Sequence, residues 1–258
     1  MERYKKWFPF KDMNSLKDKK KHKVFCFHHA GGSASTYRPW MIYDTDIDIF
    51  SIELPGKATR MTEEYISNYE ELIPQVAKAI NEVSCGQDYT LYGHSMGAMI
   101  AFKTAYLLQN DYHNKPSSLI VAGRHAPIDD IKDRYQTYME DDELVKELKR
   151  NNGTPSDILE NEEILRVIIP AIKNDYKLNE SLAYKDEVVD IPIVAHAGKE
   201  DYDASKKIME RWGLVTTNMF IIKEFEGDHF FLHQLGEDYY NYMLDNILGI
   251  REYNMGLS

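Results

Sequence analysis

The chain has little cysteine: Cys26 and Cys85 are the only two among its 258 residues. Two cysteines that form no C-x-x-C pair are too few for a disulfide framework and carry no zinc or redox signature, so we expect both to be structural thiols. The sequence also lacks an apolar run long enough to span a bilayer, and its amino terminus has positive charge without the apolar stretch of a secretory signal. We therefore expect a cytoplasmic protein with no membrane contact.

Positive charge is scarce as well. The 31 lysines and arginines are outnumbered by 42 acidic residues, which gives a formal net charge of -11 at pH 7. Nucleic-acid binding needs a basic face, so this balance argues against it as the main function. The one basic run, Lys17–Lys23, is short, and we interpret it as a solvated lead into the first strand rather than as a contact with nucleic acid or membrane. No cluster of metal-ligating residues is visible, and we expect no metal and no cofactor.

Strand-like and helix-like segments alternate along most of the chain. Apolar runs that end at turn residues predict strands within residues 23–32, 48–56, 88–95, 117–127, 191–198 and 218–227. Helical spacing predicts helices over residues 69–83, 96–110, 203–213 and 229–248. Pro74 must then lie in the first turn of its helix. Unbroken apolar strands that alternate with helices indicate a mostly parallel sheet covered by helices on both faces, in a single α/β domain over residues 1–258.

Residues 127–185 interrupt this alternation. They show helical patterns over 140–150, 155–175 and 176–184, with the stretch 151–155 as a hinge between the first two, and no strand pattern. An all-helical insertion after a strand of the sheet predicts a lid over the carboxyl edge, where ligands bind in open α/β folds.

The segment Gly93-His94-Ser95-Met96-Gly97 matches the G-x-S-x-G pattern of a serine nucleophile. The pattern is weak alone, and a glycine–serine helix start is the alternative. Its context favours the nucleophile, because Ser95 lies between a predicted strand and a predicted helix. A sharp turn there needs small residues on both sides and lifts the hydroxyl above the sheet, at a helix amino terminus that favours negative charge.

A serine hydroxyl needs a base, and the base needs an acid that sets its tautomer. In this architecture both are expected at the ends of later strands, in the order serine, acid, histidine. His229 follows Gly227-Asp228 at a strand-to-helix turn, whereas His233 lies one helical turn further on. We therefore predict His229 as the base, with His233 as the alternative.

The loop after the preceding strand offers three acids. Asp201 lies three residues after Gly198, at the tip of the loop, and we prefer it to Glu200 and Asp203. The acid would hold the tautomer of His229 and stabilise its charged form.

An oxyanion hole needs two N–H donors. One is expected from the backbone of Met96, directly after the nucleophile, and the other from Ala30 in the loop that follows the first strand. The two glycines after Ala30 let that loop curl so that its amide points into the site.

At this point the residues resemble the type II thioesterases that act in trans on non-ribosomal peptide and polyketide assembly lines. The resemblance covers almost the whole chain and rests on several motifs in register: FCFHHAGGSASTYRPW, IELPGKATR, LYGHSMGAMIAF, RHAP, DDELVKELKRNNGTP, IIPAIKNDYKLNESLAY and GDHFFL. It implies an α/β-hydrolase fold with a helical lid, a Ser95–Asp201–His229 triad, and Ala30 and Met96 as oxyanion donors.

The resemblance also implies a substrate and partners. The enzyme would hydrolyse acyl, aminoacyl or peptidyl thioesters from the phosphopantetheine arm of carrier protein domains, as a monomer, and the arm would arrive with the substrate. Two alternatives stay open: a carboxylester or lipid hydrolase on the same fold, since a fold does not set the substrate, and a non-catalytic carrier-binding protein.

The chain departs from the family pattern at two places. His28 stands where the family usually has proline, and Lys57-Ala58 where it has Arg-Gly. Because carriers are usually acidic like this chain, we expect docking through the apolar surface of the lid with help from basic residues such as Lys57 and Arg60.

Overall fold

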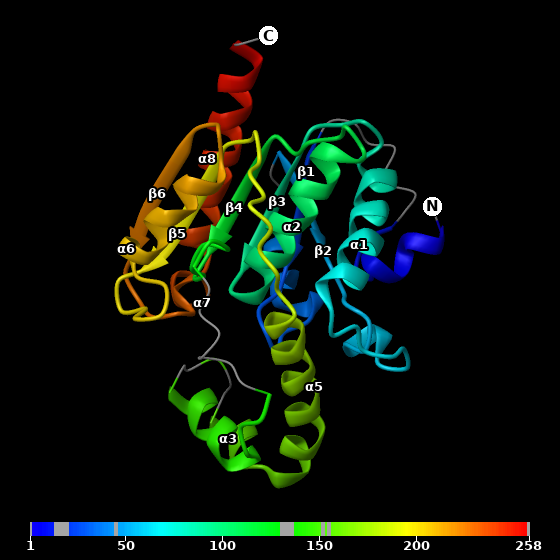
Figure 1. Ribbon diagram of the computed structural model, residues 1–258, viewed down its shortest axis with the longest axis vertical. Coiled ribbons are helices and arrows are strands. Elements are labelled where there is room, and N and C mark those ends of the chain that lie inside the picture. Colours follow the sequence, from blue (N-terminus) through cyan, green and yellow to red (C-terminus); the bar gives the residue numbers. More distant parts are fainter. Residues whose placement is uncertain are drawn as a thin grey trace.

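The computed structural model describes residues 2–12, 21–43, 46–129, 137–150, 153 and 156–256. Its centre is a six-stranded sheet with the order β2-β1-β3-β4-β5-β6, in which every pair of neighbours is parallel (Figure 1). The strands are β1 (His22–Phe27), β2 (Ile47–Ser51), β3 (Tyr89–His94), β4 (Ser118–Ala122), β5 (Ile193–Gly198) and β6 (Phe220–Phe225). Each predicted strand is present, and the prediction of a parallel sheet is confirmed.

Helices cover both faces of the sheet (Figure 1). On one face lie α1 (Tyr69–Ser84), α2 (Met96–Asn110), α6 (Lys206–Met209) and the 3-10 helix η5 (Glu210–Val215). On the other lie the 3-10 helix η3 (Ala34–Ile42), α7 (Phe231–Leu235) and α8 (Glu237–Gly256). Two further short 3-10 helices are η1 (Glu2–Trp7) and η4 (Ala58–Arg60).

Two apolar cores result from the alternation of side chains along each strand. In the central strand β3, Leu91 packs with the core beneath α1 and α2, whereas Tyr92 packs with the core beneath η3 and α8. Neighbouring residues of β4 divide in the same way, because successive side chains of a strand point to opposite faces. Both faces are therefore dry, as the unbroken apolar runs predict.

Two details of the predicted helices are wrong. Pro74 lies in the second turn of α1, not the first, and it is tolerated there because it is on the exposed face, where water can bond to the carbonyl that it leaves without a donor. The helix predicted over 229–248 is two helices, α7 and α8, separated by Gly236 at a φ of +52°. Glycine adopts that left-handed conformation without the clash of a Cβ, so the chain turns there.

The insertion lies beyond the carboxyl ends of the strands, as a lid with α3 (Asp141–Arg150), α4 (Ser156–Leu159) and α5 (Glu162–Glu180) (Figure 1). The part of 127–185 that the structure describes contains helices and no strand, as predicted, although α5 runs unbroken past the boundary predicted at 175. Residues 151, 152, 154 and 155 of the predicted hinge lie outside the described residues. The lid has a core of its own, formed by Leu144, Leu148, Leu159, Ile169, Ile172 and Tyr176.

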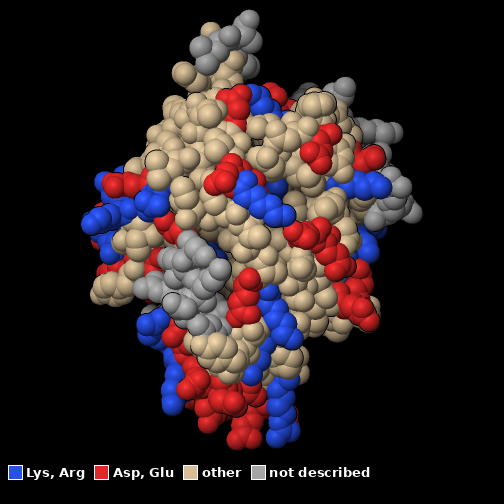
Figure 2. Space-filling model, in the orientation of Figure 1, with Lys and Arg blue, Asp and Glu red and all other residues tan. Residues whose placement is uncertain are grey.

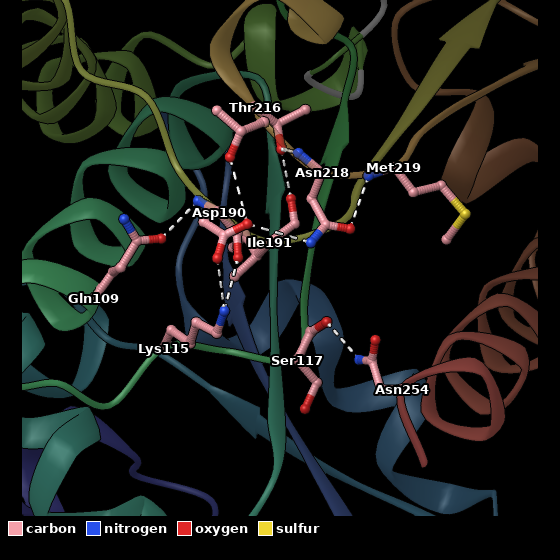
Figure 3. Close-up of polar contacts among 10 residues, drawn as sticks. Gln109, Lys115, Ser117, Asp190, Ile191, Thr216, Asn218, Met219 and Asn254 are labelled. Carbon is pink, nitrogen blue, oxygen red and sulfur yellow. Dashed lines mark hydrogen bonds and ion pairs between the residues drawn. The ribbon is translucent and has the colours of Figure 1, made fainter. Parts of the chain in front are cut away.

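Polar contacts tie the loops at the opposite edge, where β4, β5 and β6 begin (Figure 3). Lys115 Nζ donates to the backbone oxygen of Asp190 at 3.1 Å and to its carboxylate at 2.9 Å. The side chain of Asn254 in α8 donates to the backbone oxygen of Ser117 at 3.3 Å. Such exposed contacts each contribute little to stability. The carboxyl edge is the one that faces the lid.

Acidic side chains gather at the tip of the lid on the face that Figure 2 shows. The first turn of the lid helix α3 contains Asp141, Asp142 and Glu143, all exposed. Carboxylates at a helix amino terminus are favourably placed for the helix dipole. Among the described residues, none of the helices has the length and apolar character needed to cross a membrane.

Candidate active site

Ser95 occupies the tight turn between β3 and α2. Its backbone has φ 54° and ψ -119°, a conformation that non-glycine residues rarely adopt, and its N–H donates to the backbone oxygen of Ala122 at 2.8 Å. A Cβ on Gly93 would lie 2.2 Å from the backbone oxygen of Gly97, and a Cβ on Gly97 would lie 2.1 Å from that of Phe27. The glycines on either side of Ser95 are therefore required by close backbone packing, which is the physical content of the G-x-S-x-G pattern.

His229 and Asp201 come together from neighbouring loops. His229 Nδ1 lies 2.8 Å from Asp201 Oδ2, while Asp201 Oδ1 accepts the backbone N–H groups of Asp203 and Ala204, both at 3.0 Å. A carboxylate only accepts, so Nδ1 of His229 is the donor of this hydrogen bond, and in the neutral imidazole the lone pair is on Nε2. The structure thus places Asp201 against His229, and it leaves Glu200 exposed to solvent.

The environment of Asp201 favours its charged form. Burial acts against ionisation, but the hydrogen bond and charge of His229, together with the two backbone N–H donors, outweigh burial and hold the pKa of Asp201 below its ordinary value. Asp201 is 4% exposed, so water competes little for these contacts. The carboxylate is therefore ionised at neutral pH and can stabilise a positively charged imidazole.

Ser95 and His229 line one cavity of about 240 Å³ between the sheet edge and the lid. Ala30 lines the same cavity from the loop after β1. The lid contributes an apolar wall, made by Leu148, Ile158, Ile168, Ile172 and Tyr176. A space of this kind binds the hydrocarbon part of a ligand and shields the reacting atoms from water.

The cavity has polar lining residues that were not predicted from the sequence, namely Arg124, Asn179 and His29. Arg124 follows β4, and Asn179 lies near the end of α5 with its side-chain oxygen buried and without a hydrogen-bond partner. The RHAP motif contains Arg124, but nothing in the local sequence indicates that its side chain reaches the cavity. Asn179 carries no sequence signal beyond its place in a helical pattern.

The two predicted oxyanion donors lie at suitable local structures. Met96 is the first residue of α2, and the first N–H groups of a helix have no partner within it. Ala30 is the second residue of a turn that the N–H of Gly32 closes by donating to the oxygen of His29 at 3.0 Å. Gly31 is the third residue, with φ +81°, as in type II turns. That these N–H groups bind an oxyanion stays a prediction.

A cluster of aromatic rings surrounds His229. His94 Nε2 donates to the backbone oxygen of His229 at 2.8 Å, and the two rings lie 5.0 Å apart. His29 packs edge-on against the rings of His94 and Phe230, at 5.5 and 5.0 Å. Burial lowers the pKa of His29 and of His94 well below the ordinary value, so both rings are neutral. Within the described ranges, no group of three or more His, Cys, Asp or Glu side chains is arranged to hold a metal ion.

The expectation that Lys57 and Arg60 face a partner protein is wrong. Lys57 is buried and forms an ion pair with Asp175 of α5. Arg60 is 3% exposed, stacks over the ring of Trp7 at 4.2 Å, and pairs with Glu63 at 2.7 Å. Both cations are therefore occupied within the fold.

Comparisons with known proteins agree on one family. The family model of the thioesterase domain matches residues 22–248. The chain is 34% identical over 232 residues to the gramicidin S biosynthesis protein GrsT of Aneurinibacillus migulanus, and the match covers 89% of each chain.

Solved structures show the same architecture. The type II thioesterase BorB from the borrelidin biosynthetic cluster is 28% identical, with a TM-score of 0.78 over 87% of this chain and 92% of its own. ClbQ from the colibactin pathway superposes with a TM-score of 0.83 over 90% of this chain and 99% of its own, at 24% identity. The predicted α/β-hydrolase fold is confirmed by these likenesses.

Proposed function

The chain belongs to the thioesterase family, as a type II thioesterase, and from this premise we propose that it hydrolyses acyl, aminoacyl or peptidyl thioesters carried on the phosphopantetheine arm of carrier protein domains. Such hydrolysis clears stalled or misloaded carriers of a non-ribosomal peptide or polyketide synthase. The observation that carries the proposal is that His229, which contacts Asp201, lines one cavity with Ser95 under an apolar lid.

In the first half-reaction Ser95 Oγ attacks the thioester carbonyl while Nε2 of His229 takes the hydroxyl proton. The carbonyl oxygen becomes an oxyanion, which the backbone N–H groups of Ala30 and Met96 stabilise. The tetrahedral intermediate collapses, the carbon–sulfur bond breaks, and the thiol of the arm leaves with the proton that His229 returns. Thiolate is a good leaving group, so this step needs little assistance.

In the second half-reaction water attacks the acyl-enzyme. His229 removes the proton from water, the same two N–H groups hold the second oxyanion, and the proton passes to Ser95 Oγ as the carboxylic acid departs. Asp201 holds the imidazole in the correct tautomer throughout and stabilises its charged form. The lid keeps bulk water out of the cavity, and it must open to admit a tethered arm.

Three further features belong to the proposal. The enzyme needs no resident cofactor, because the phosphopantetheine arrives with the substrate. We expect it to act as a monomer in the cytoplasm. Its partners are acidic carrier domains, which dock without steering by Lys57 or Arg60, since those side chains are buried.

The test is a panel of carrier proteins loaded with acetyl, aminoacyl and peptidyl groups, each incubated with the enzyme and followed by intact-protein mass. We expect loss of the acyl mass from some members of the panel, and no loss with Ser95→Ala. A fluorophosphonate should label the wild type but not Ser95→Ala. Labelling of neither protein would favour a carrier-binding protein without catalysis.

Turnover of matched oxoesters distinguishes a thioesterase from a carboxylester or lipid hydrolase. The enzyme should turn over an acyl-pantetheine thioester faster than the ester of the same acid with an alcohol of similar size. A strong preference for the oxoester would point to a carboxylester or lipid hydrolase.

A further inference from the structure

The lid helix α5 contacts the loop that follows β1 at Gly31. The backbone N–H of Gly31 donates to Asp175 Oδ2 at 2.6 Å, across 144 positions of sequence. One turn earlier in α5, Ile172 packs against the same glycine, since a Cβ on Gly31 would lie 3.2 Å from Ile172 Cγ1. Gly31 therefore meets the lid through a polar and an apolar contact, and Ala30 beside it packs against the apolar core of the lid.

The turn at His29–Gly32 explains what the polar contact does. Its own hydrogen bond uses the N–H of Gly32 and leaves the N–H groups of Ala30 and Gly31 without a partner in the turn. Asp175 takes the N–H of Gly31, which orients the peptide plane that joins Ala30 to Gly31. The N–H of Ala30 belongs to the preceding peptide plane, between His29 and Ala30, and the two planes meet at the Cα of Ala30, which lines the cavity.

The anchor is dry and charged. The side chains of Asp175 and Lys57 are each 5% exposed, and they pair in the interior between α5 and the segment after β2. Burial raises the pKa of Asp175, while Lys57 and the N–H of Gly31 act in the opposite direction and favour the carboxylate. Breaking one partner from such a pair leaves a buried charge uncompensated, so the pair is held in one geometry.

We propose that Asp175 is a positioning residue that reaches from the lid to hold the turn at Gly31, so that the N–H of Ala30 is aimed at the oxyanion, with Lys57 as its counter-ion. The proposal rests on the proposed function, because it assumes that Ala30 serves the oxyanion of thioester hydrolysis. It makes the oxyanion hole complete only when α5 is seated, and it thus links the chemical step to closure of the lid.

Two double variants isolate the hydrogen bond from the buried charge. Lys57→Met/Asp175→Asn keeps an oxygen that can accept from Gly31, whereas Lys57→Met/Asp175→Leu removes it at similar volume, and neither leaves an unpaired buried charge. Asp141→Asn is the control, because it breaks another ion pair of α5, with Lys173 at 2.5 Å, away from the turn. Thermal unfolding shows whether each variant folds. If Lys57→Met/Asp175→Leu does not fold, Lys57→Met/Asp175→Ala replaces it.

Three measurements are made on each variant. They are kcat and KM for butyryl-pantetheine, the affinity for a trifluoromethyl ketone thioether of pantetheine, and the affinity for the butyryl amide analogue, in which nitrogen replaces the thioester sulfur. Ser95 Oγ adds to the ketone carbon as its proton passes to Nε2 of His229, and the former carbonyl oxygen becomes an oxyanion, whereas the amide binds without reacting. Only the ketone therefore needs a well-aimed oxyanion hole.

We expect the variant without the acceptor to lose roughly 10- to 100-fold in kcat and a similar factor in ketone affinity, since removal of a whole oxyanion donor costs about 10²- to 10³-fold. Its affinity for the amide should stay close to that of the wild type. For Lys57→Met/Asp175→Asn and for Asp141→Asn, kcat, KM and both affinities should stay close to wild type. Equal losses for ketone and amide, a rise in KM alone, or no difference between the two double variants would overturn the proposal. Failure of the proposed function would show differently, as turnover by Ser95→Ala or as a wild type that binds ketone no tighter than amide.

Discussion

Replacement of Asp201 by asparagine should almost abolish turnover while the fold survives. The carboxylate has two different neighbours: Oδ1 accepts two backbone N–H groups, and Oδ2 meets His229 Nδ1. An asparagine has one oxygen, and the two backbone donors require that oxygen at the Oδ1 position, because an amide NH₂ there would face two N–H groups. The NH₂ group must then point at His229.

This orientation reverses the tautomer of the imidazole. Facing a donor, Nδ1 of His229 becomes the acceptor, so the proton moves to Nε2, which can no longer take the proton of Ser95. The expected loss in kcat is up to about 10⁴-fold, the size seen when a triad acid is replaced in this way. That loss corresponds to about 5 kcal/mol of transition-state stabilisation. Because the amide keeps both backbone contacts, thermal stability should change little.

The assay is turnover of one acyl-carrier protein at saturating substrate, with the melting temperature measured on the same samples. Glu200→Gln and Asp203→Asn are matched controls, since they neutralise the other two acids of the loop, and both should keep near-normal turnover. Near-normal turnover of Asp201→Asn, with a large loss in either control, would refute the reasoning and move the role to that acid.

Two further predictions concern stability. Gly97→Ala places a Cβ 2.1 Å from the backbone oxygen of Phe27 and should lower the free energy of unfolding by about 3 kcal/mol. The control Gly249→Ala, in α8, places a Cβ with no atom within 4 Å, so it should be neutral or slightly stabilising. Urea unfolding of both variants measures these effects, and equal effects would contradict the prediction. Burial lowers the pKa of His196 from its ordinary value of 6.5 to about 3. At a pH between these two values, His196 is protonated in the unfolded chain but not in the native protein. The free energy of unfolding therefore falls as the pH drops from 6.5 towards 3. At pH 5 this histidine should lower the free energy of unfolding by about 2 kcal/mol. The free energy of unfolding of His196→Asn should therefore fall less between pH 7 and pH 5 than that of the wild type. Parallel curves of unfolding free energy against pH for the two proteins would show that His196 binds the proton when folded.

The parallel sheet and the place of Ser95 were predictable because their signals are local. A strand reveals itself by an apolar run, a helix by its spacing, and the turn at Ser95 by glycines two residues away on either side. The errors at Pro74 and Gly236 have the same origin. Local pattern does not reveal that Pro74 sits on an exposed face, or that α7 and α8 change direction at one glycine.

The candidate site was predictable in part. The G-x-S-x-G pattern pointed to Ser95, and the places of Asp201 and His229 in their loops favoured them over Glu200, Asp203 and His233. The structure brings Asp201 and His229 into contact. The sequence did not show that His29 and His94 pack around His229. Both lie within recognised motifs, at positions to which the motif assigns no role. Nor did it show that Asn179 lines the cavity.

The sequence by itself determined the class of fold and the family, and it pointed to Ser95, Asp201 and His229 as the candidate site. Each of these depends on side chains that are neighbours along the chain or on motifs of fixed spacing. Only the tertiary structure decided what Lys57 does. An exposed Lys57 could help to dock a carrier protein, whereas a buried Lys57 needs an anionic partner. Its partner Asp175 lies 118 positions away, in another element. Burial decides between these roles through the cost of taking a charge out of water, and burial depends on how α5 folds back over the sheet edge, which no local pattern contains.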